Sequence, residues 1–418
     1  MKLIKKNKLI LVESEMKSPK GHFLDNLIET TNTFKKKLKI LWIVNKYFDD
    51  EKTYLPSNIK ILRSISGNFY KRKENKFLYL IEEIYLFFNN IFQIFYFSFY
   101  FLKNKNFSRY FNALKSNYFF IPRYFFSFYN QYRKLNLKRN DHVFFQTARR
   151  KDISLINFLI KIDKHHPKFH IRVMLPPKIK FKGFFYYLKS IDKELVSKRV
   201  FVYLFGDFTY KLFLKHSKSK KGILKSNIPW SFHSRKNKSN NHIVGFVGNA
   251  RKARGFHLLP KLISLLERKN TNLKFLIQFS KTSDDLINVK NELYQLAKKN
   301  KKIQIIEKYC DYKQFRNILK KIDIMPIIHN SKEINTITSG TMYSCLSHEI
   351  PVVIPSGTDF MKNILKYKSF EKANNLNQYA DEIIKISSKY DYYLRNVKLN
   401  SNILKKILKN DPLKKNIY

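Results

Sequence analysis

Two glycine-containing segments in the latter half of the chain carry residue types that bind phosphate. In the first, residues 245–269, a strand-like run ends at Gly248, a short loop carries Arg251 and Arg254, and Gly255 opens an amphipathic helix. Glycine lets the backbone approach a ligand closely, and arginine offers paired hydrogen-bond donors to phosphate oxygens. The segment therefore indicates an anion-binding loop, with a solvated basic turn as the alternative.

The second segment, residues 323–358, places a predicted helix start at Ser339-Gly340-Thr341 after another strand-like run. The first turn of a helix offers unpaired amide groups and a positive dipole end, which suit phosphate. Simple N-capping by Thr338 and Ser339 is the alternative. Both segments follow strands of one predicted sheet, so they should meet at its carboxyl edge, where open α/β sheets bind ligands.

His22 is the candidate acid or base, because it follows Gly21 on a predicted strand-to-helix loop and histidine titrates near neutral pH. A structural turn histidine is the alternative. Thr147 follows a further predicted strand and would face the same ligand site. The histidines and two cysteines form no metal-ligand motif. We therefore expect neither a bound metal nor a cofactor.

Apolar strand-like runs alternate with helical periods along most of the chain, which is typical of a parallel α/β sheet. The pattern breaks into a Ser-, Asn- and Lys-rich stretch at 217–241. We predict a first domain at 1–225, a linker at 226–241, a second domain at 242–395, and a C-terminal helix with a solvated basic tail at 396–418. The predicted strands occupy 9–15, 39–45, 142–147, 169–175, 199–205, 242–248, 273–279, 302–306, 323–328 and 351–355.

An aromatic helical insertion is predicted at about 77–135 in the first domain. Residues 84–102 carry no charge, which makes a membrane span one interpretation. At 100° per residue, however, the polar residues fall into one stripe, so we predict an amphipathic helix packed on its own domain. A helix lying on a membrane surface is the second alternative. The stripe consists of Glu83, Asn89, Asn90, Gln93, Tyr96 and Tyr100.

Charge and composition narrow the classes of partner. The 418 residues include 82 Lys and Arg against 31 Asp and Glu, a net charge of +51, but the over-used residue types are those of A/T-rich codons and the basic residues are spread along the chain. We therefore expect no nucleic-acid partner. Such a surface attracts phosphate-bearing substrates and lipid headgroups. Two cysteines and a start without a signal peptide predict a cytoplasmic protein, with the inner membrane face as a peripheral location.

The two phosphate-binding segments resemble the donor half of GT-B nucleotide-sugar glycosyltransferases of glycosyltransferase family 4 (group 1). That family has G-x-x-R-x-x-K-G-F-x-L-L-P after the first strand of its second domain, and here Arg254 stands at the usual lysine. It also has S-G-V-x-x-E-A-L-x-x-G-K-P-V-V-V-P. The matching residues are Gly248, Arg251, Arg254 and Gly255 in the first motif, and Ser339, Gly340, Leu346, Pro351, Val352, Val353 and Pro355 in the second.

The resemblance implies two Rossmann-like, doubly wound domains facing a central cleft. It implies that Arg251 and Arg254 hold the donor diphosphate and that Ser339, Gly340 and Thr341 contact it from the helix end. Gly21 and His22 match the glycine-rich first loop of the acceptor domain. Other residues would line the cleft, namely Gly21, Thr147, Gly248 and Thr338.

Besides Arg254, the chain departs from the family pattern at three positions in and before the second motif. Thr336 and Ser344 stand where the family has two glutamates eight positions apart, and Glu349 replaces a glycine. The resemblance implies transfer of a sugar from a nucleotide-sugar to a hydroxyl of a glycan or lipid-linked acceptor, in surface polysaccharide or lipid-linked glycan synthesis. The alternatives are a nucleotide-sugar epimerase or inactive homologue of the same fold, and a non-catalytic protein that binds nucleic acid or membranes.

Overall fold

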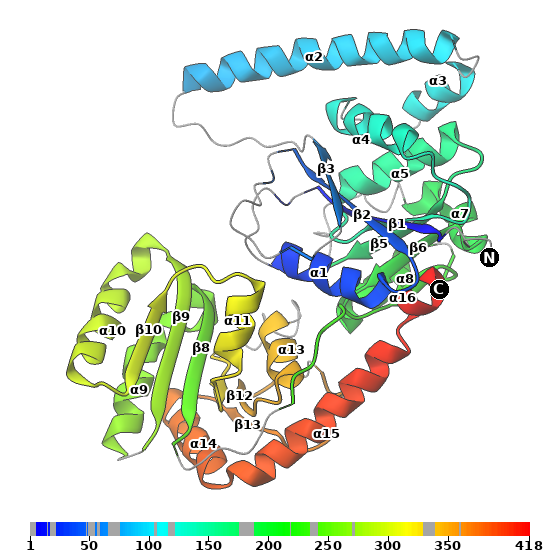
Figure 1. The fold of residues 1–418 in the computed structure, drawn as a ribbon. Coiled ribbons are helices and arrows are strands. Elements are labelled where there is room, and N and C mark those ends of the chain that lie inside the picture. The colour runs from blue at the N-terminus through cyan, green and yellow to red at the C-terminus, as the bar shows by residue number, and fades with distance from the viewer. Residues whose placement is uncertain are drawn as a thin grey trace. The chain divides into compact units, whose positions relative to one another are not determined.

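The chain divides into two compact units in the computed structural model (Figure 1): residues 1–228 together with 412–418, and residues 229–411. The structure describes residues 6–14, 16, 22–46, 48, 55–56, 59–65, 76–103, 107–115, 122–174, 188–217, 219–234, 241–269, 272–328, 339–358 and 361–418.

The first unit is built on a seven-stranded sheet in the order β3-β2-β1-β4-β5-β6-β7. Neighbouring strands all pair in parallel. The strands are β1 (Lys8–Glu13), β2 (Lys39–Asn45), β3 (Lys60–Ile65), β4 (His142–Phe145), β5 (Lys168–Val173), β6 (Val200–Leu204) and β7 (Ile223–Lys225). The helices are α1 (His22–Phe34), α2 (Lys76–Lys103), α3 (Phe107–Lys115), α4 (Pro122–Lys134), α5 (Arg150–Ile162), α7 (Asp192–Val196), α8 (Asp207–His216) and α16 (Pro412–Ile417).

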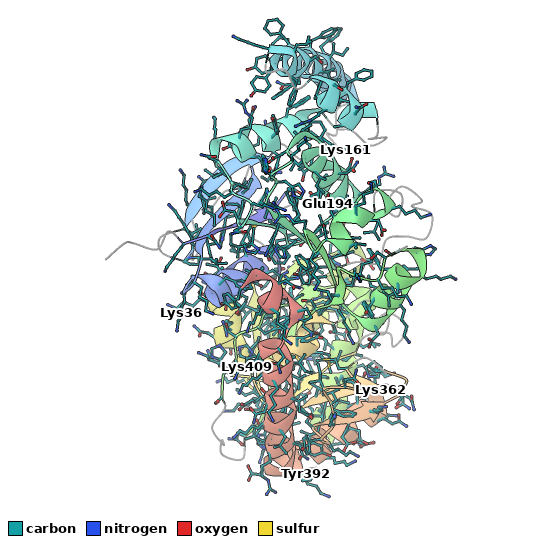
Figure 2. The ribbon with its side chains drawn as sticks, turned by 90° about the vertical axis from the view of Figure 1, so that its right-hand side faces the viewer. Lys36, Lys161, Glu194, Lys362, Tyr392 and Lys409 are labelled. Atoms are coloured by element: carbon teal, nitrogen blue, oxygen red, sulfur yellow. The ribbon has the colours of Figure 1, made fainter. Side chains whose placement is uncertain are left out.

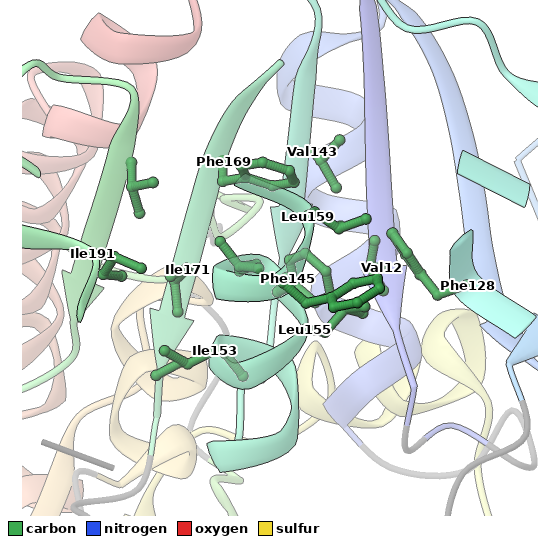
Figure 3. Packing of buried hydrophobic residues seen from close by; sticks show 14 of the residues in the cluster. Val12, Phe128, Val143, Phe145, Ile153, Leu155, Leu159, Phe169, Ile171 and Ile191 are labelled. Carbon is green, nitrogen blue, oxygen red and sulfur yellow. The ribbon is translucent and has the colours of Figure 1, made fainter. Parts of the chain in front are cut away.

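The core of the first unit forms where α5 covers the central strands. Apolar residues of β1, β4 and β5 are buried almost completely, and Ile153, Leu155 and Leu159 of α5 pack onto them (Figure 3). Each such side chain contributes about 1.5–3 kcal/mol when it leaves water. Strands buried on both faces become continuous apolar runs, which is why these strands are easily recognised in the sequence.

The helical insertion packs through its aromatic rings. The ring of Phe97 on α2 stacks on Phe126 of α4 with 3.9 Å between centroids, and Phe101 stacks on Tyr110 of α3 at 4.5 Å. Phe97, Phe126 and Tyr110 are buried almost completely. Aromatic pairs of this kind add about 0.5–1.5 kcal/mol beyond the area that they bury. One side of α2 is therefore fixed to the first unit.

The other side of α2 corrects the amphipathic prediction. The predicted packing of the helix on its own domain occurs through Phe97 and Phe101, but the most exposed positions on the other side are phenylalanines, with Phe95 and Phe99 each 71% exposed. Of the polar stripe, Tyr96 is 55% exposed, whereas Gln93 and Tyr100 are half-buried. None of the helices in the described part of the chain combines the length and apolar character that a membrane crossing requires.

The second unit contains two three-stranded parallel sheets, β10-β9-β8 and β11-β12-β13, which meet edge to edge. The amide of Gly245 on β8 donates to the carbonyl of Ile324 at 2.9 Å, and Val244 forms a parallel bridge with Ile324. The combined order β10-β9-β8-β11-β12-β13 is that of a Rossmann sheet. The strands are β8 (Ile243–Ala250), β9 (Lys274–Thr282), β10 (Ile303–Glu307), β11 (Met325–Pro326), β12 (Val352–Pro355) and β13 (Phe370–Ala373).

The helices of the second unit complete this plan. The short 3-10 turns η1 (Lys252–Arg254), η2 (Phe256–Leu258) and η3 (Asp284–Leu286) precede longer helices. The α-helices are α9 (Leu259–Arg268), α10 (Ile287–Lys299), α11 (Tyr312–Leu319), α13 (Gly340–Ser347), α14 (Leu376–Ser388) and α15 (Tyr390–Lys409). The prediction of two Rossmann-like α/β domains is confirmed by this topology.

The end of the chain differs from the predicted solvated tail. Residues 412–417 form helix α16, in which Leu413 and Ile417 are buried. The hydroxyl of Tyr418 donates to the carbonyl of Thr33 at 2.7 Å, and its ring packs edge-on against Phe34. The last residues therefore belong to the first unit, because their apolar side chains are covered there.

Basic side chains come from many separate elements. Figure 2 labels Lys36 after α1, Lys161 on α5, Lys362 after β12 and Lys409 at the end of α15. The structure thus spreads the lysines over both units.

Candidate phosphate-binding site

Gly248 shapes the end of β8, where the chain enters the turn with Arg251 and Arg254. Its φ of +121° is a conformation that other residues rarely adopt, and a Cβ at this position would lie 2.5 Å from Nη1 of Arg254. The Arg254 guanidinium therefore lies against the bare backbone of Gly248. Arg251 is exposed, and its carbonyl accepts the amide of Arg254 at 3.0 Å, which closes the turn.

Gly255 presses the turn onto the end of β11. Its φ is +74°, and a Cβ here would lie 2.4 Å from the carbonyl oxygen of Ile328. Phe256 follows and is fully buried. A side chain at position 255 would therefore force the turn away from the sheet, which gives the glycine in this motif a steric reason.

Gln278 on β9 fixes the other side of the turn. Its Oε1 accepts the amide of Gly248 at 3.1 Å, and its Nε2 donates to the carbonyl of Lys308 at 2.9 Å. Gln278 is only 3% exposed, so both bonds are shielded from water. Sequence analysis missed this residue, since nothing in the local pattern shows that it joins the loops after β8 and β10.

Helix α13 begins as predicted at the Ser-Gly-Thr sequence. Ser339 is the N-cap, and its hydroxyl accepts the amide of Met342 at 3.4 Å. Gly340 is exposed, and a Cβ there would meet no atom within 4 Å in the part of the chain that the structure describes. The glycine is thus not required by packing within the described residues. An open first turn with a positive dipole end can accept an anion.

The body of α13 is held from one side by the segment that precedes β8. The rings of Trp230 and Tyr343 are nearly parallel, with 5.7 Å between centroids. The amide of His233 donates to the carbonyl of Ser347 at 2.8 Å. These contacts fix the direction of the helix and hence the direction in which its first turn points.

The sheet brings the two segments to one edge. Strands β8 and β11 are parallel neighbours at the centre of the second unit, and the turn with Arg251 and Arg254 follows β8 while α13 follows β11. The chain runs outward in opposite directions from these two strands, which makes this the topological switch point where α/β sheets bind ligands. The shared carboxyl edge that the sequence predicted is present.

A hollow of about 420 Å³ opens beside the turn. Burial, with a smaller contribution from the Lys252 ammonium, lowers the pKa of the His257 imidazole, whose Nδ1 is buried without a hydrogen-bond partner among the described residues. The hydroxyl of Tyr379 donates to the carbonyl of Ile327 at 2.9 Å and holds the end of β11. The hollow is lined by Lys252, Ala253, His257, Leu258, Ile328, Pro355, Ala373, Asn374, Asn375, Leu376 and Tyr379.

Sequence analysis did not find this hollow. Its walls come from the ends of four strands and the start of α14, so no local motif contains it.

The remaining predicted site residues lie elsewhere or outside the described residues. Gly21, Thr336 and Thr338 are outside them. His22 is the first residue of α1, and Thr147 follows β4, both in the first unit. The Oγ1 of Thr147 is buried and has no hydrogen-bond partner in the described part of the chain. Thr341 lies in the first turn of α13 and is half-buried.

Comparison with known proteins identifies the architecture. No protein-family model and no curated protein matches the sequence. Solved structures do match over nearly the whole chain. A glycosyltransferase from Rickettsia africae ESF-5 superposes with a TM-score of 0.58 at 14% identity, covering 99% of this chain and 96% of its own. The chain has the GT-B fold.

Two further GT-B structures agree. Sucrose-phosphate synthase from Thermosynechococcus elongatus has a TM-score of 0.57 at 9% identity, covering 96% of this chain and 95% of its own. HepE from Anabaena, solved in complex with UDP and glucose, has a TM-score of 0.52 at 11% identity, covering 95% of this chain and 94% of its own. At these identities the likeness establishes the fold.

The structure gives a backbone reason for the glycine that the family 4 motif has at position 349. Glu349 follows the last turn of α13 with a φ of +56°, in the left-handed region that favours glycine. It is 3% exposed. The family glycine thus matches a backbone requirement that this chain meets with a buried glutamate. Ser344, at the position of a family glutamate, is buried within α13.

Proposed function

We propose that this protein transfers a sugar from a nucleotide-sugar to an acceptor hydroxyl, and that the second unit holds the donor diphosphate. One observation carries the proposal. The turn with Arg251 and Arg254 and the open first turn of α13 follow neighbouring parallel strands at the topological switch point. Guanidinium groups and helix-end amides are the groups that proteins use for diphosphates.

The GT-B fold and the family 4 resemblance of both segments support the proposal. HepE, which has the same fold, was crystallised with UDP and glucose. By this analogy the donor carries a nucleoside diphosphate, and the acceptor is a glycan or a lipid-linked sugar of surface polysaccharide synthesis.

The chemistry requires one bond to form and one to break at the anomeric carbon. The acceptor oxygen bonds to that carbon while the bond to the diphosphate oxygen breaks, and the electron pair leaves with the diphosphate. Arg251, Arg254 and the α13 amides would stabilise the negative charge that develops on the leaving group. His22 is our candidate for positioning the acceptor hydroxyl and taking its proton. The proposed mechanism uses no metal ion.

Thermal denaturation with a panel of nucleoside diphosphates tests the donor site. A ligand that binds only the folded protein raises its apparent stability, by about 2.7 kcal/mol at 100 times the Kd. Loss of a hydrogen bond to a charged group costs about 1.5–3 kcal/mol, so Arg251→Ala should raise the Kd of the nucleotide selected from the panel at least tenfold. Arg268→Ala is the matched control, because Arg268 is an exposed arginine at the far end of α9.

Two results would contradict the proposal. An unchanged response of Arg251→Ala would show that the diphosphate lies elsewhere. Binding of a nucleotide-sugar without hydrolysis or transfer, in the presence of a cell lysate as the source of acceptor, would favour an inactive homologue.

A further inference from the structure

A line of apolar side chains, four of them aromatic, projects from α2 into solvent. Phe88, Phe92, Phe95, Phe99 and Leu102, here called the aromatic stripe, are separated by four, three, four and three residues. On an α-helix this spacing places them along one side. Their exposed fractions are 63%, 65%, 71%, 71% and 55%. Phe111 on α3 is 55% exposed as well.

Ordinary packing does not account for this stripe. The opposite side of α2 is already buried through Phe97 and Phe101, which stack on α4 and α3. Figure 1 shows α2 as a long helix at the edge of the first unit, with α3 and α4 on one side of it. Contiguous exposed apolar surfaces of soluble proteins mark interaction sites.

Basic residues predominate in the sequence around the stripe. From Ile84 to Asn140 there are nine basic residues and no Asp or Glu, while Glu82 and Glu83 lie earlier on α2. Lys103 at the end of α2 and Arg133 and Lys134 on α4 are exposed, and the Arg133 guanidinium lies 4.1 Å from the centroid of the Tyr100 ring. The nine residues are Lys103, Lys105, Arg109, Lys115, Arg123, Arg133, Lys134, Lys138 and Arg139.

We propose that the aromatic stripe docks the protein on the surface of an anionic lipid bilayer, with α2 lying along the interface. An apolar helix face bordered by Lys and Arg suits this position, because the rings enter the acyl boundary while the cations meet the headgroup phosphates. A second copy of the chain is the less favourable occupant, since each copy carries a net charge of +51 and like charges repel. The stripe is separate from the proposed donor site, because that site lies in the second unit.

Vesicle flotation with the full-length protein tests this docking. The probes are vesicles of phosphatidylcholine alone and vesicles with 30% phosphatidylglycerol. We expect binding to the anionic vesicles that weakens in 0.5 M salt, and at least tenfold weaker binding for the variant Phe92→Ser, Phe95→Ser and Phe99→Ser. The matched control replaces three apolar residues of the second unit, Ile287, Tyr392 and Leu399, by serine. These are 47%, 46% and 42% exposed.

A fluorescence measurement avoids dependence on a triple variant. In Phe95→Trp the new indole should be quenched by brominated lipids in anionic vesicles, whereas in Tyr392→Trp, at the position labelled in Figure 2, it should not. Thermal denaturation checks that each variant folds.

Three outcomes would overturn the proposal. One is equal vesicle binding by the wild type and the stripe variant. Another is quenching that is the same at positions 95 and 392. The third is a dimer in sedimentation velocity that the stripe variant abolishes, without any vesicle binding, which would make a second copy the occupant.

Discussion

Replacing Gly340 by alanine should separate ligand binding from folding. Gly340 is the first residue of α13, and a Cβ there would meet no atom of the described residues within 4 Å, so the methyl group clashes with none of them. Alanine is a better helix former than glycine by up to about 1 kcal/mol. The free energy of unfolding should therefore stay unchanged or rise by as much as that.

The same methyl group should obstruct a diphosphate at the helix end. If it displaces one charge-assisted hydrogen bond, the loss is about 1.5–3 kcal/mol, or about ten- to hundredfold in Kd. Isothermal titration calorimetry with the nucleoside diphosphate selected by thermal denaturation measures the Kd, and urea denaturation measures the stability. Unchanged affinity in a variant of equal or higher stability would refute the assignment of this helix end to the donor.

Three further predictions concern stability and the shape of the site. Gly255→Ala should destabilise the protein by about 2–4 kcal/mol in urea denaturation, because φ is +74° and the Cβ would collide with the carbonyl of Ile328. An unchanged midpoint of the urea denaturation curve would contradict the described turn. Gly248→Ala should weaken nucleotide binding in calorimetry at least tenfold, because its Cβ would displace the Arg254 guanidinium. Burial, with a smaller contribution from Lys168, lowers the pKa of His142 to about 4, so the folded state holds this imidazole neutral. The free energy of unfolding should therefore fall by about 3 kcal/mol as the pH is lowered from 6.5 to 4. Urea denaturation at several pH values should show this fall, and His142→Gln should reduce it.

The sequence predicts the strands that are buried on both faces. The prediction for 39–45 coincides with β2, and those for the central strands of both units differ from the structure mainly at their ends. The missed strands β3, β7 and β13 are short or carry charges, as in Phe370–Ala373, where Glu371 and Lys372 interrupt the apolar run. Strand β7 lies within the stretch 217–241 where the pattern breaks, because three residues are too few to show a period.

Helix α2 shows why the direction of a helix face is harder to predict than the helix itself. The angular argument predicted one polar stripe, but Gln93 and Tyr100 of that stripe are half-buried and phenylalanines are the most exposed residues of the helix. Which side is buried depends on partners distant in the sequence, here Phe126 and Tyr110.

The residues of the candidate site also differ in whether the sequence could reveal them. Arg251, Gly255 and Ser339 sit in local motifs, so their types and spacing were visible in the sequence. Gln278 joins two strand ends and His257 lines the hollow between several of them, and only the folded sheet brings these residues together.

The return of residues 412–418 to the first unit means that the polypeptide passes between the units twice, after Ile228 and after Asp411. The second unit is thus an insert within the first rather than an appendage. A fragment that stops at Ile228 would lack one of its own helices and leave Phe34 without the Tyr418 ring. Anyone who expresses the first unit alone should supply those last seven residues.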